Sequence, residues 1–302
     1  MPNLNKKQAA GFSVLSNLLL TLLKLAAGTL SGSMSIVAEA AHSAFDLAAS
    51  LIAYVSVRIS DRPADEGHPY GHHKIENISG SVEAALIFIV AAWIIYESVE
   101  RILTHARVEY IPLGLAVMTV SLLMNIFVSR LLYRIAARTR SIALEADAAH
   151  LHSDVLTSIG VIVTLGVILF AREKLGVELS FLDPVVSIFI ALYILRIAWE
   201  LLRKSYPSLM DERARSDIEQ KLHQLIRDFC ADCYSFHKLR TRQAGSRVHI
   251  DFHLQFLPET PLEDAHLLCH DLIQKIEAEI PGSEVIVHIE PIEDRPGPGE
   301  GL

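Results

Sequence analysis

Cysteine is scarce in this chain, and clusters of basic residues are missing. The 302 residues include three cysteines, Cys230, Cys233 and Cys269, and all three follow the long apolar runs. Three cysteines cannot complete a framework of disulfides, which favours a reducing compartment such as the cytosol. The formal net charge is −8 and no basic tract occurs. Nucleic acid is therefore excluded as an expected partner.

Two short sequence signals are also missing. No small-residue cleavage pattern follows the first apolar run, so we expect that run to be a retained helix and not a signal peptide. No His-Glu-x-x-His occurs, the motif that supplies metal ligands and a general base in many zinc proteases. The sequence therefore argues against an intramembrane protease, and we expect no enzyme activity.

Apolar residues make up 51% of the chain and mean hydropathy is +0.34. The long apolar runs lie in residues 1–204, whereas residues 211–302 have the composition of a mixed soluble domain. A helix needs about 20 apolar residues to cross the hydrocarbon core of a membrane. Six stretches are long enough, at about 9–30, 33–58, 79–103, 110–135, 142–171 and 181–203. We therefore predict a six-helix transmembrane domain over residues 1–208, which the motifs below indicate as a transport domain, and a soluble domain over residues 209–302, which the basic residues and motifs below indicate as cytoplasmic and metal-binding.

Lysine and arginine near the ends of these stretches indicate how the helices are oriented. With both termini in the cytoplasm, the cytoplasmic side holds Lys6, Lys7, Arg58, Arg62, Lys74, Arg130, Arg134, Arg138, Arg140, Arg203 and Lys204. The opposite side then holds Arg101, Arg107, Arg172 and Lys174. This asymmetry predicts that both termini and the soluble domain are cytoplasmic, in agreement with the free cysteines.

Two histidine–aspartate pairs lie inside the apolar stretches. His42 precedes Asp46 by four residues, and His150 precedes Asp154 by four. Residues four apart lie on one face of a helix, so each pair directs an imidazole and a carboxylate to a common point. Ionisable groups within a membrane are costly and therefore indicate function. The four side chains offer the tetrahedral set that zinc prefers, and the lack of a thiolate disfavours copper(I).

Other polar residues lie in or near the predicted spans. Lys24 and Asn125 are interpreted as structural residues that pair across helices or extend toward the membrane surface. Glu39 lies three residues before His42 and either lines the same cavity or ends a helix. Glu83 and Asp183 have no role assigned from the sequence.

The chain resembles the cation diffusion facilitator family over nearly its whole length. The resemblance rests on the six spans and on these segments: Ser31–Ile36, His68–His72, Ala146–His150, Ser153–Val155, Leu239–Gln243 and Val287–Pro291. Its members are homodimeric metal/proton antiporters. The resemblance implies an exporter most similar to bacterial zinc and iron efflux pumps, in the lipid of a bacterial inner membrane, with protons as counter-ion.

The ligand set favours zinc as the exported ion. Many bacterial members of the family have aspartate where this chain has His42, whereas a histidine–aspartate pair on both helices is more similar to eukaryotic vesicular zinc transporters. Replacing a hard carboxylate by imidazole favours zinc over manganese. Metal ligands must be deprotonated, and histidine titrates near neutral pH, so protons and Zn²⁺ compete for the site. A broader exporter of Fe²⁺, Cd²⁺ or Mn²⁺ and a non-transporting membrane metal sensor are the alternatives.

The resemblance also implies two further metal sites. A loop site consists of Asp65, His68 and His72; the alternative is a solvated loop whose histidines are incidental. A binuclear zinc site, structural or regulatory, lies at the dimer interface of the soluble domains and consists of His237, His253, His266, His288 and Glu290. The alternative there is a set of surface histidines in a histidine-rich chain.

Two weaker signals complete the list of candidates. Lys74 matches a family lysine that pairs with an aspartate at the start of the soluble domain, and Asp211 fits that position as a hinge. Cys230 and Cys233 are spaced like metal ligands, but no second cysteine pair lies nearby, which favours an incidental helix end.

Periodicity in residues 211–302 predicts an α-β-β-α-β order. Residues 212–228 carry an apolar stripe at helical spacing, and residues 235–243 and 247–257 alternate like strands around Gly245. A second helix is expected from Leu262 to Ile280 and a last strand from Glu284 to Ile289. This order is an open α+β sandwich, similar to the ferredoxin-like cytoplasmic domain of the family.

Overall fold

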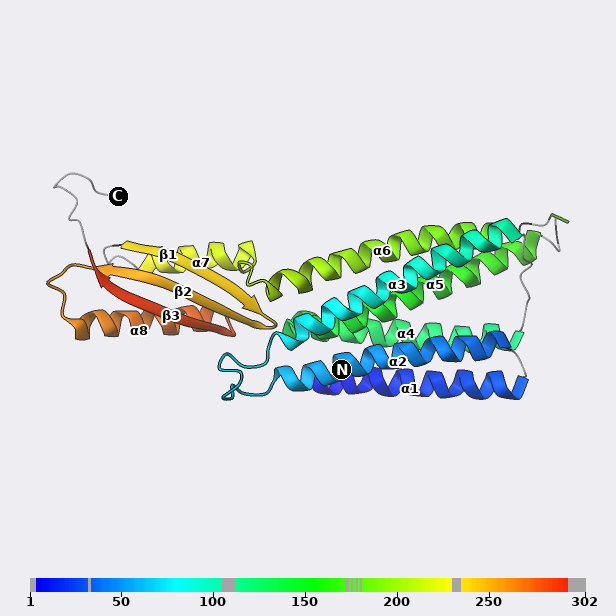
Figure 1. Ribbon diagram of the computed structural model, residues 1–302, viewed down its shortest axis with the longest axis horizontal. Coiled ribbons are helices and arrows are strands. Elements are labelled where there is room, and N and C mark those ends of the chain that lie inside the picture. The colour runs from blue at the N-terminus through cyan, green and yellow to red at the C-terminus, as the bar shows by residue number, and fades with distance from the viewer. Residues whose placement is uncertain are drawn as a thin grey trace. The chain divides into compact units, whose positions relative to one another are not determined.

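The computed structural model describes residues 4–31, 34–104, 112–171, 174, 176–177, 179, 181–229 and 235–292. The chain divides into two compact units, Met1–Tyr206 and Pro207–Leu302. Long helices form the first unit, and a small sheet with helices forms the second (Figure 1).

The described part of the first unit consists of six long helices. They are α1 (Lys6–Ser31), α2 (Met34–Ser60), α3 (Ile75–Thr104), α4 (Pro112–Thr139), α5 (Ile142–Phe170) and α6 (Leu182–Leu209). All six are long and apolar enough to cross a membrane. The six predicted spans are confirmed, although several helices extend beyond them, because the polar residues at their ends continue the helical hydrogen bonding.

Small residues lie between these helices and large apolar residues point away from them. Ala9, Ala143 and Ala148 are fully buried in a cluster built from α1, α2, α4 and α5, where the small side chains let helix backbones approach closely. Conversely, Phe45 and Phe189 are largely exposed on the outer surface of the unit. Exposed large apolar side chains are what membrane lipid requires, and the fold is that of an α-helical membrane protein.

Helix α5 is buried along its first half and open along its second. Nearly every side chain from Ile142 to Val155 is buried, whereas most of those described from Leu156 onward are partly or fully exposed. The helices therefore pack most tightly around α5 at the end where it begins. We call this the Glu76 end, after a buried residue in the first turn of α3.

The second unit has the predicted α-β-β-α-β order. Its elements are α7 (Ser216–Phe229), β1 (Ser235–Ala244), β2 (Arg247–Phe256), α8 (Leu262–Glu279) and β3 (Ser283–Pro291). The sheet order is β1-β2-β3, in which β1 and β2 are antiparallel and β2 and β3 are parallel. Gly245 has a φ of 57° in the turn between β1 and β2, a conformation that glycine adopts without strain. The predicted open α+β fold is confirmed.

Alternation along β2 positions the core and the polar face of this sheet. Ile250, Phe252 and Leu254 are buried against Leu222 of α7 and Leu272 of α8. The residues between them point to the opposite face, because side chains alternate along a strand. This face carries the histidines described below.

Candidate metal sites

The two histidine–aspartate pairs meet between α2 and α5. Asp46 Oδ1 lies 3.2 Å from His150 Nε2 across the helix interface and 3.9 Å from His42 Nε2 on its own helix. Ligand atoms of His42, Asp46 and Asp154 all lie within 4.8 Å of one another. Ligands of a tetrahedral zinc ion are about 3.4 Å apart, given metal–ligand distances of about 2.0–2.2 Å. Small side-chain adjustments would therefore let His42, Asp46 and Asp154 bind one cation, while His150 lies outside this group of three and contacts it through Asp46.

This cluster lies at the boundary between the closed and open halves of α5. Asp46 and His150 are 7% and 5% exposed, whereas the side chain of His42 is 43% exposed. Asp154 Oδ2 is buried and has no hydrogen-bond partner among the described residues. A buried carboxylate oxygen needs a hydrogen bond or a cation, so the donor set suits a divalent cation.

Lys24 lies closer to this cluster than the sequence indicated. Its Nζ donates a 2.7 Å hydrogen bond to Ser43 Oγ, beside His42 on α2. It also interacts electrostatically with Asp46 and Asp154. Lys24, which the sequence indicated only as a structural residue, therefore also places a positive charge next to the carboxylates of Asp46 and Asp154. The spacing along the sequence gave no signal of this, because Lys24 comes from α1.

Two further carboxylates are fully buried near the cluster. Glu83 of α3 accepts a 3.1 Å hydrogen bond from Ser79 Oγ, and Asp147 lies one turn before His150 on α5. Glu83 Oε2 has no hydrogen-bond partner among the described residues. Both carboxyl groups interact electrostatically with His150, one of the proposed metal ligands. The three-residue spacing of Asp147 and His150 was the available signal in the sequence.

Three other polar residues singled out from the sequence of the membrane unit are not part of this cluster as described. Asn125 is buried within α4, as a packing residue would be. The side chains of Glu39 and Asp183 lie outside the described residues.

The loop between α2 and α3 brings its three predicted ligands together. Asp65 Oδ1 lies 3.1 Å from His68 Nδ1, and Asp65 Oδ2 lies 3.3 Å from His72 Nε2. The two imidazole rings are 4.3 Å apart. The backbone N–H of His68 donates to Asp65 and lowers the pKa of this carboxyl, and the two histidines lower it further. An ionised carboxylate between two imidazoles can hold a divalent cation.

In the second unit, strand register lines up three histidines. His237 of β1 is opposite His253 of β2, which is in turn opposite His288 of β3. Ring centroids are 5.3 Å apart in the first pair and 4.6 Å in the second. The row is fixed by pairing among three strands, which no single segment of sequence reveals.

Glu290 joins the histidines of this row. Its two carboxylate oxygens lie 2.8 Å from His237 Nε2 and 2.8 Å from His253 Nδ1, and one lies 3.9 Å from His288 Nε2. Its pKa is lowered, first by the hydrogen bond with His253 and then by one from Gln255 and by nearby histidine charge. Three imidazoles around an ionised carboxylate fit a divalent cation. The longer arm of glutamate still reaches the histidines.

Other predicted residues lie apart from this row or outside the description. His266 is on α8, where its ring stacks with that of His270 at 6.5 Å; its role as a ligand stays a prediction. Asp211 forms a 3.1 Å ion pair with Arg242, and its pairing with Lys74 also stays a prediction. Cys230 and Cys233 lie outside the described residues.

Six membrane helices around a buried histidine–aspartate cluster define a membrane transporter of metal cations. Residues 11–210 match the family model of the cation efflux transmembrane domain, and residues 214–292 match that of the cation efflux protein, cytoplasmic domain. The chain belongs to the cation diffusion facilitator, or cation efflux, family. It is therefore a transporter and not an enzyme.

Relatives align along nearly the whole chain. The uncharacterized transporter sll1263 of Synechocystis sp. is 35% identical over 272 residues, which cover 90% of this chain and 86% of its own. The cation-efflux pump FieF of Shewanella oneidensis is 32% identical over 290 residues, covering 96% and 95%. A solved structure of CzrB in its Zn form, described there as a proposed zinc transporter, is 30% identical to this chain. The match covers 28% of this chain and 98% of the CzrB chain, with a TM-score of 0.27.

Proposed function

We propose that this protein exports Zn²⁺ from the bacterial cytoplasm in exchange for protons, as a homodimer in the inner membrane. The observation that carries the proposal is the short distance between Asp46 and His150, which joins two ligand pairs on separate helices at one point. His42, Asp46, His150 and Asp154 are the ligands of the exported ion. The cation-efflux pumps named among the relatives support the direction of transport.

The ligand chemistry supports zinc as the preferred cargo. Two imidazoles and two carboxylates form a borderline N/O set that suits Zn²⁺ better than the harder Mn²⁺. Fe²⁺ and Cd²⁺ compete for such a set, so a broader exporter is the second candidate. Both candidates use the same four residues and differ only in the ranking of metals.

Protonation of the same ligands supplies the coupling to H⁺. A metal binds only to deprotonated ligands, and histidine is the side chain that titrates nearest neutral pH. A proton arriving from outside displaces Zn²⁺, and Zn²⁺ from the cytoplasm displaces the proton. Glu83 and Asp147 lie near enough to exchange protons with this site.

The distribution of basic residues supports a cytoplasmic Glu76 end. Lys6 and Lys7 begin α1 at this end, Arg138 lies in the last turn of α4, and Arg140 follows that helix. Because α5 is buried from residue 142 to residue 155, the described conformation is closed on that side. The metal site then opens toward the outside, where protons enter and Zn²⁺ leaves.

The row of histidines in the second unit supports a regulatory or structural zinc site. His237, His253, His288 and Glu290 would hold resident Zn²⁺, with His266 as an additional ligand. Each chain carries a net charge of −8, so dications bound between facing domains would offset repulsion between two copies. Zinc bound there stabilises the dimer by mass action.

Reconstitution into liposomes tests the proposal. Purified protein is inserted into vesicles that contain a zinc-sensitive dye, and Zn²⁺ uptake is measured with and without a pH gradient. Uptake that follows the gradient, with a counter-flow of protons, supports the antiporter. Zinc binding without uptake would instead identify a membrane sensor, and a preference for Mn²⁺ would contradict the assignment of the cargo.

A further inference from the structure

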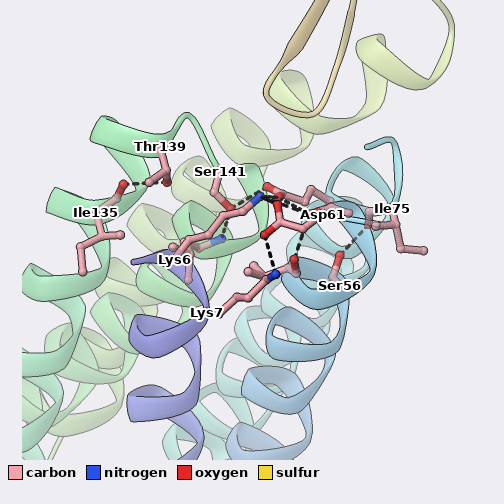
Figure 2. Close-up of polar contacts among 12 residues, drawn as sticks. Lys6, Lys7, Ser56, Asp61, Ile75, Ile135, Thr139 and Ser141 are labelled. Carbon is pink, nitrogen blue, oxygen red and sulfur yellow. Dashed lines mark hydrogen bonds and ion pairs between the residues drawn. The ribbon is translucent and has the colours of Figure 1, made fainter. Parts of the chain in front are cut away.

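A buried cluster of polar side chains joins four helices at the Glu76 end. Glu76 of α3 is 1% exposed and accepts hydrogen bonds from Lys6 Nζ at 2.9 Å, Ser60 Oγ at 2.7 Å and Ser141 Oγ at 2.6 Å. Lys6 Nζ also forms a 2.7 Å ion pair with Asp61. Figure 2 shows Lys6, Asp61 and Ser141 meeting there from α1, the end of α2 and the start of α5.

The cluster ties together the two helices that carry the metal ligands. Ser60 ends α2, which carries His42 and Asp46, and Ser141 caps α5 by accepting a hydrogen bond from the backbone N–H of Leu144. Glu76 binds both serines at once, through different carboxylate oxygens. Ser141 is nine residues before His150, or about 14 Å along the helix at 1.5 Å per residue. The cluster therefore fixes the separation of α2 and α5 on one side of the site.

Stability alone does not explain a buried charge in this place. Moving an ion pair out of water costs about as much as the attraction returns, so apolar residues would hold these helices together equally well. Hydrogen bonds differ from apolar packing because they require a defined geometry, so each bond is either formed or broken. Such contacts suit an element with two discrete arrangements.

We infer that Lys6, Ser60, Glu76 and Ser141 form the cytoplasmic gate of the transporter, with Glu76 as its positioning residue. In the described conformation the intact cluster holds α2 and α5 together and closes the path to the metal site. Access from the cytoplasm requires Ser141 to leave Glu76, so that the start of α5 moves away from α2. The inference rests on the proposed function for the direction of access, but the movement itself can be measured separately.

The first measurement is kinetic and uses the chain with its native cysteines. Glu76→Gln removes the charge that holds Lys6, and Ser141→Ala removes one donor to Glu76 while leaving the ion pair in place. Each substitution weakens the closed state relative to the state open to the cytoplasm. Where a hydrogen bond to a charged group is lost, the equilibrium constant between the two states should shift by about tenfold or more. The KM for cytoplasmic Zn²⁺ and kcat are then both expected to fall, because the inward-open state gains population.

Two control variants separate a gate from a general defect. Lys7→Gln changes a neighbouring lysine that is 45% exposed, forms a 2.9 Å ion pair with Asp61 and is not one of the four gate residues, so KM and kcat should stay unchanged. Ser141→Thr keeps both the hydroxyl and the helix cap, so it should restore the wild-type KM lost in Ser141→Ala. A variant that merely misfolds loses kcat in proportion to the active fraction and keeps its KM.

The second measurement is the distance between the helix ends. Spin labels are placed at Arg62→Cys, just after α2, and at Arg140→Cys, directly before the α5 cap Ser141, in a chain whose three native cysteines are replaced by alanine. Without metal, we expect a population at longer distance in Glu76→Gln that is about tenfold larger than in the parent. Unchanged distances together with an unchanged KM in both variants would overturn the gate. Absence of Zn²⁺ flux in the wild type would instead overturn the proposed function, and the distances would still decide whether the cluster opens.

Discussion

Asp46 of α2 lies closer to His150 of α5, at 3.2 Å, than to His42 on its own helix, at 3.9 Å. The spacing of the two pairs predicts that each acts as a unit, whereas the structure joins them through the shared Asp46 carboxylate. A movement that separates α2 from α5 would therefore change the proposed metal site directly. This geometry links cation binding to the relative position of two helices.

Replacing Asp154 by alanine should abolish transport while the protein still folds and dimerises. Asp154 is one of the two anionic ligands that we propose for the dication, and its buried Oδ2 has no hydrogen-bond partner among the described residues. Removing a supporting residue of a metal site costs about 10–100-fold in affinity, so loss of a ligand should reduce flux by at least about 100-fold. His152→Ala is the control, since its ring packs against Tyr133 and faces away from the site. Normal flux of Asp154→Ala at saturating Zn²⁺ would contradict the assignment.

Changing His42 to aspartate should broaden the range of transported metals. A third carboxylate makes the ligand set harder, which favours Mn²⁺ and Fe²⁺ relative to Zn²⁺. Competition assays should show the preference for Zn²⁺ over Mn²⁺ falling on the order of tenfold. An unchanged ranking of metals would mean that the residue at position 42 does not set selectivity.

A double change of His253 and His288 to alanine should affect regulation without removing transport-site binding. The two rings are 4.6 Å apart in the row of histidines, so zinc held there would be lost. We expect loss of zinc-dependent dimer tightening and a lower flux, while binding by His42 and Asp154 persists. Zinc stoichiometry per chain, measured beside flux, checks this. Loss of all zinc binding would show that the two sites are not separable.

Glu290 should make the stability of the second unit depend on pH in the acid range. Its pKa is lowered in the folded state, chiefly by the hydrogen bond with His253. Its contribution to stability is therefore fully present above the ordinary glutamate pKa of about 4.3 and is lost as pH falls through the lower folded-state value. The melting temperature of the wild type should fall toward that of Glu290→Gln as pH is lowered from about 5 to about 3.

Adding a methyl group at Gly80 should destabilise the membrane unit. A Cβ there would lie 2.8 Å from Ile142 Cγ2 and closer still to Ser205 Oγ. Overpacking of this kind costs about 1–3 kcal/mol, so Gly80→Ala should lower the melting temperature in detergent. Gly166→Ala is the matched control, because nothing lies within 4 Å of a Cβ at that position. Equal melting temperatures for the two variants would mean that α3 is free to shift.

The sequence alone determined the parts of this protein that depend on local pattern. Length and hydropathy predicted six membrane helices, and periodicity predicted the order of helices and strands in the second unit. The kinds and spacing of ligands, such as His42 four residues before Asp46, indicated a metal cation as the substrate. These features are local because helix and strand repeats depend on neighbours only a few residues away.

The tertiary structure alone decided which residues meet. Asp46 reaches His150 because α2 packs against α5, and His237, His253 and His288 form a row because three strands pair in one register. Glu76 binds Lys6 and Ser141, which are 70 and 65 residues away in the chain. Lys24, interpreted from the sequence as structural, lies next to the proposed metal ligands. Such contacts depend on packing between distant segments, which is a property of the folded chain and not of any one stretch of it.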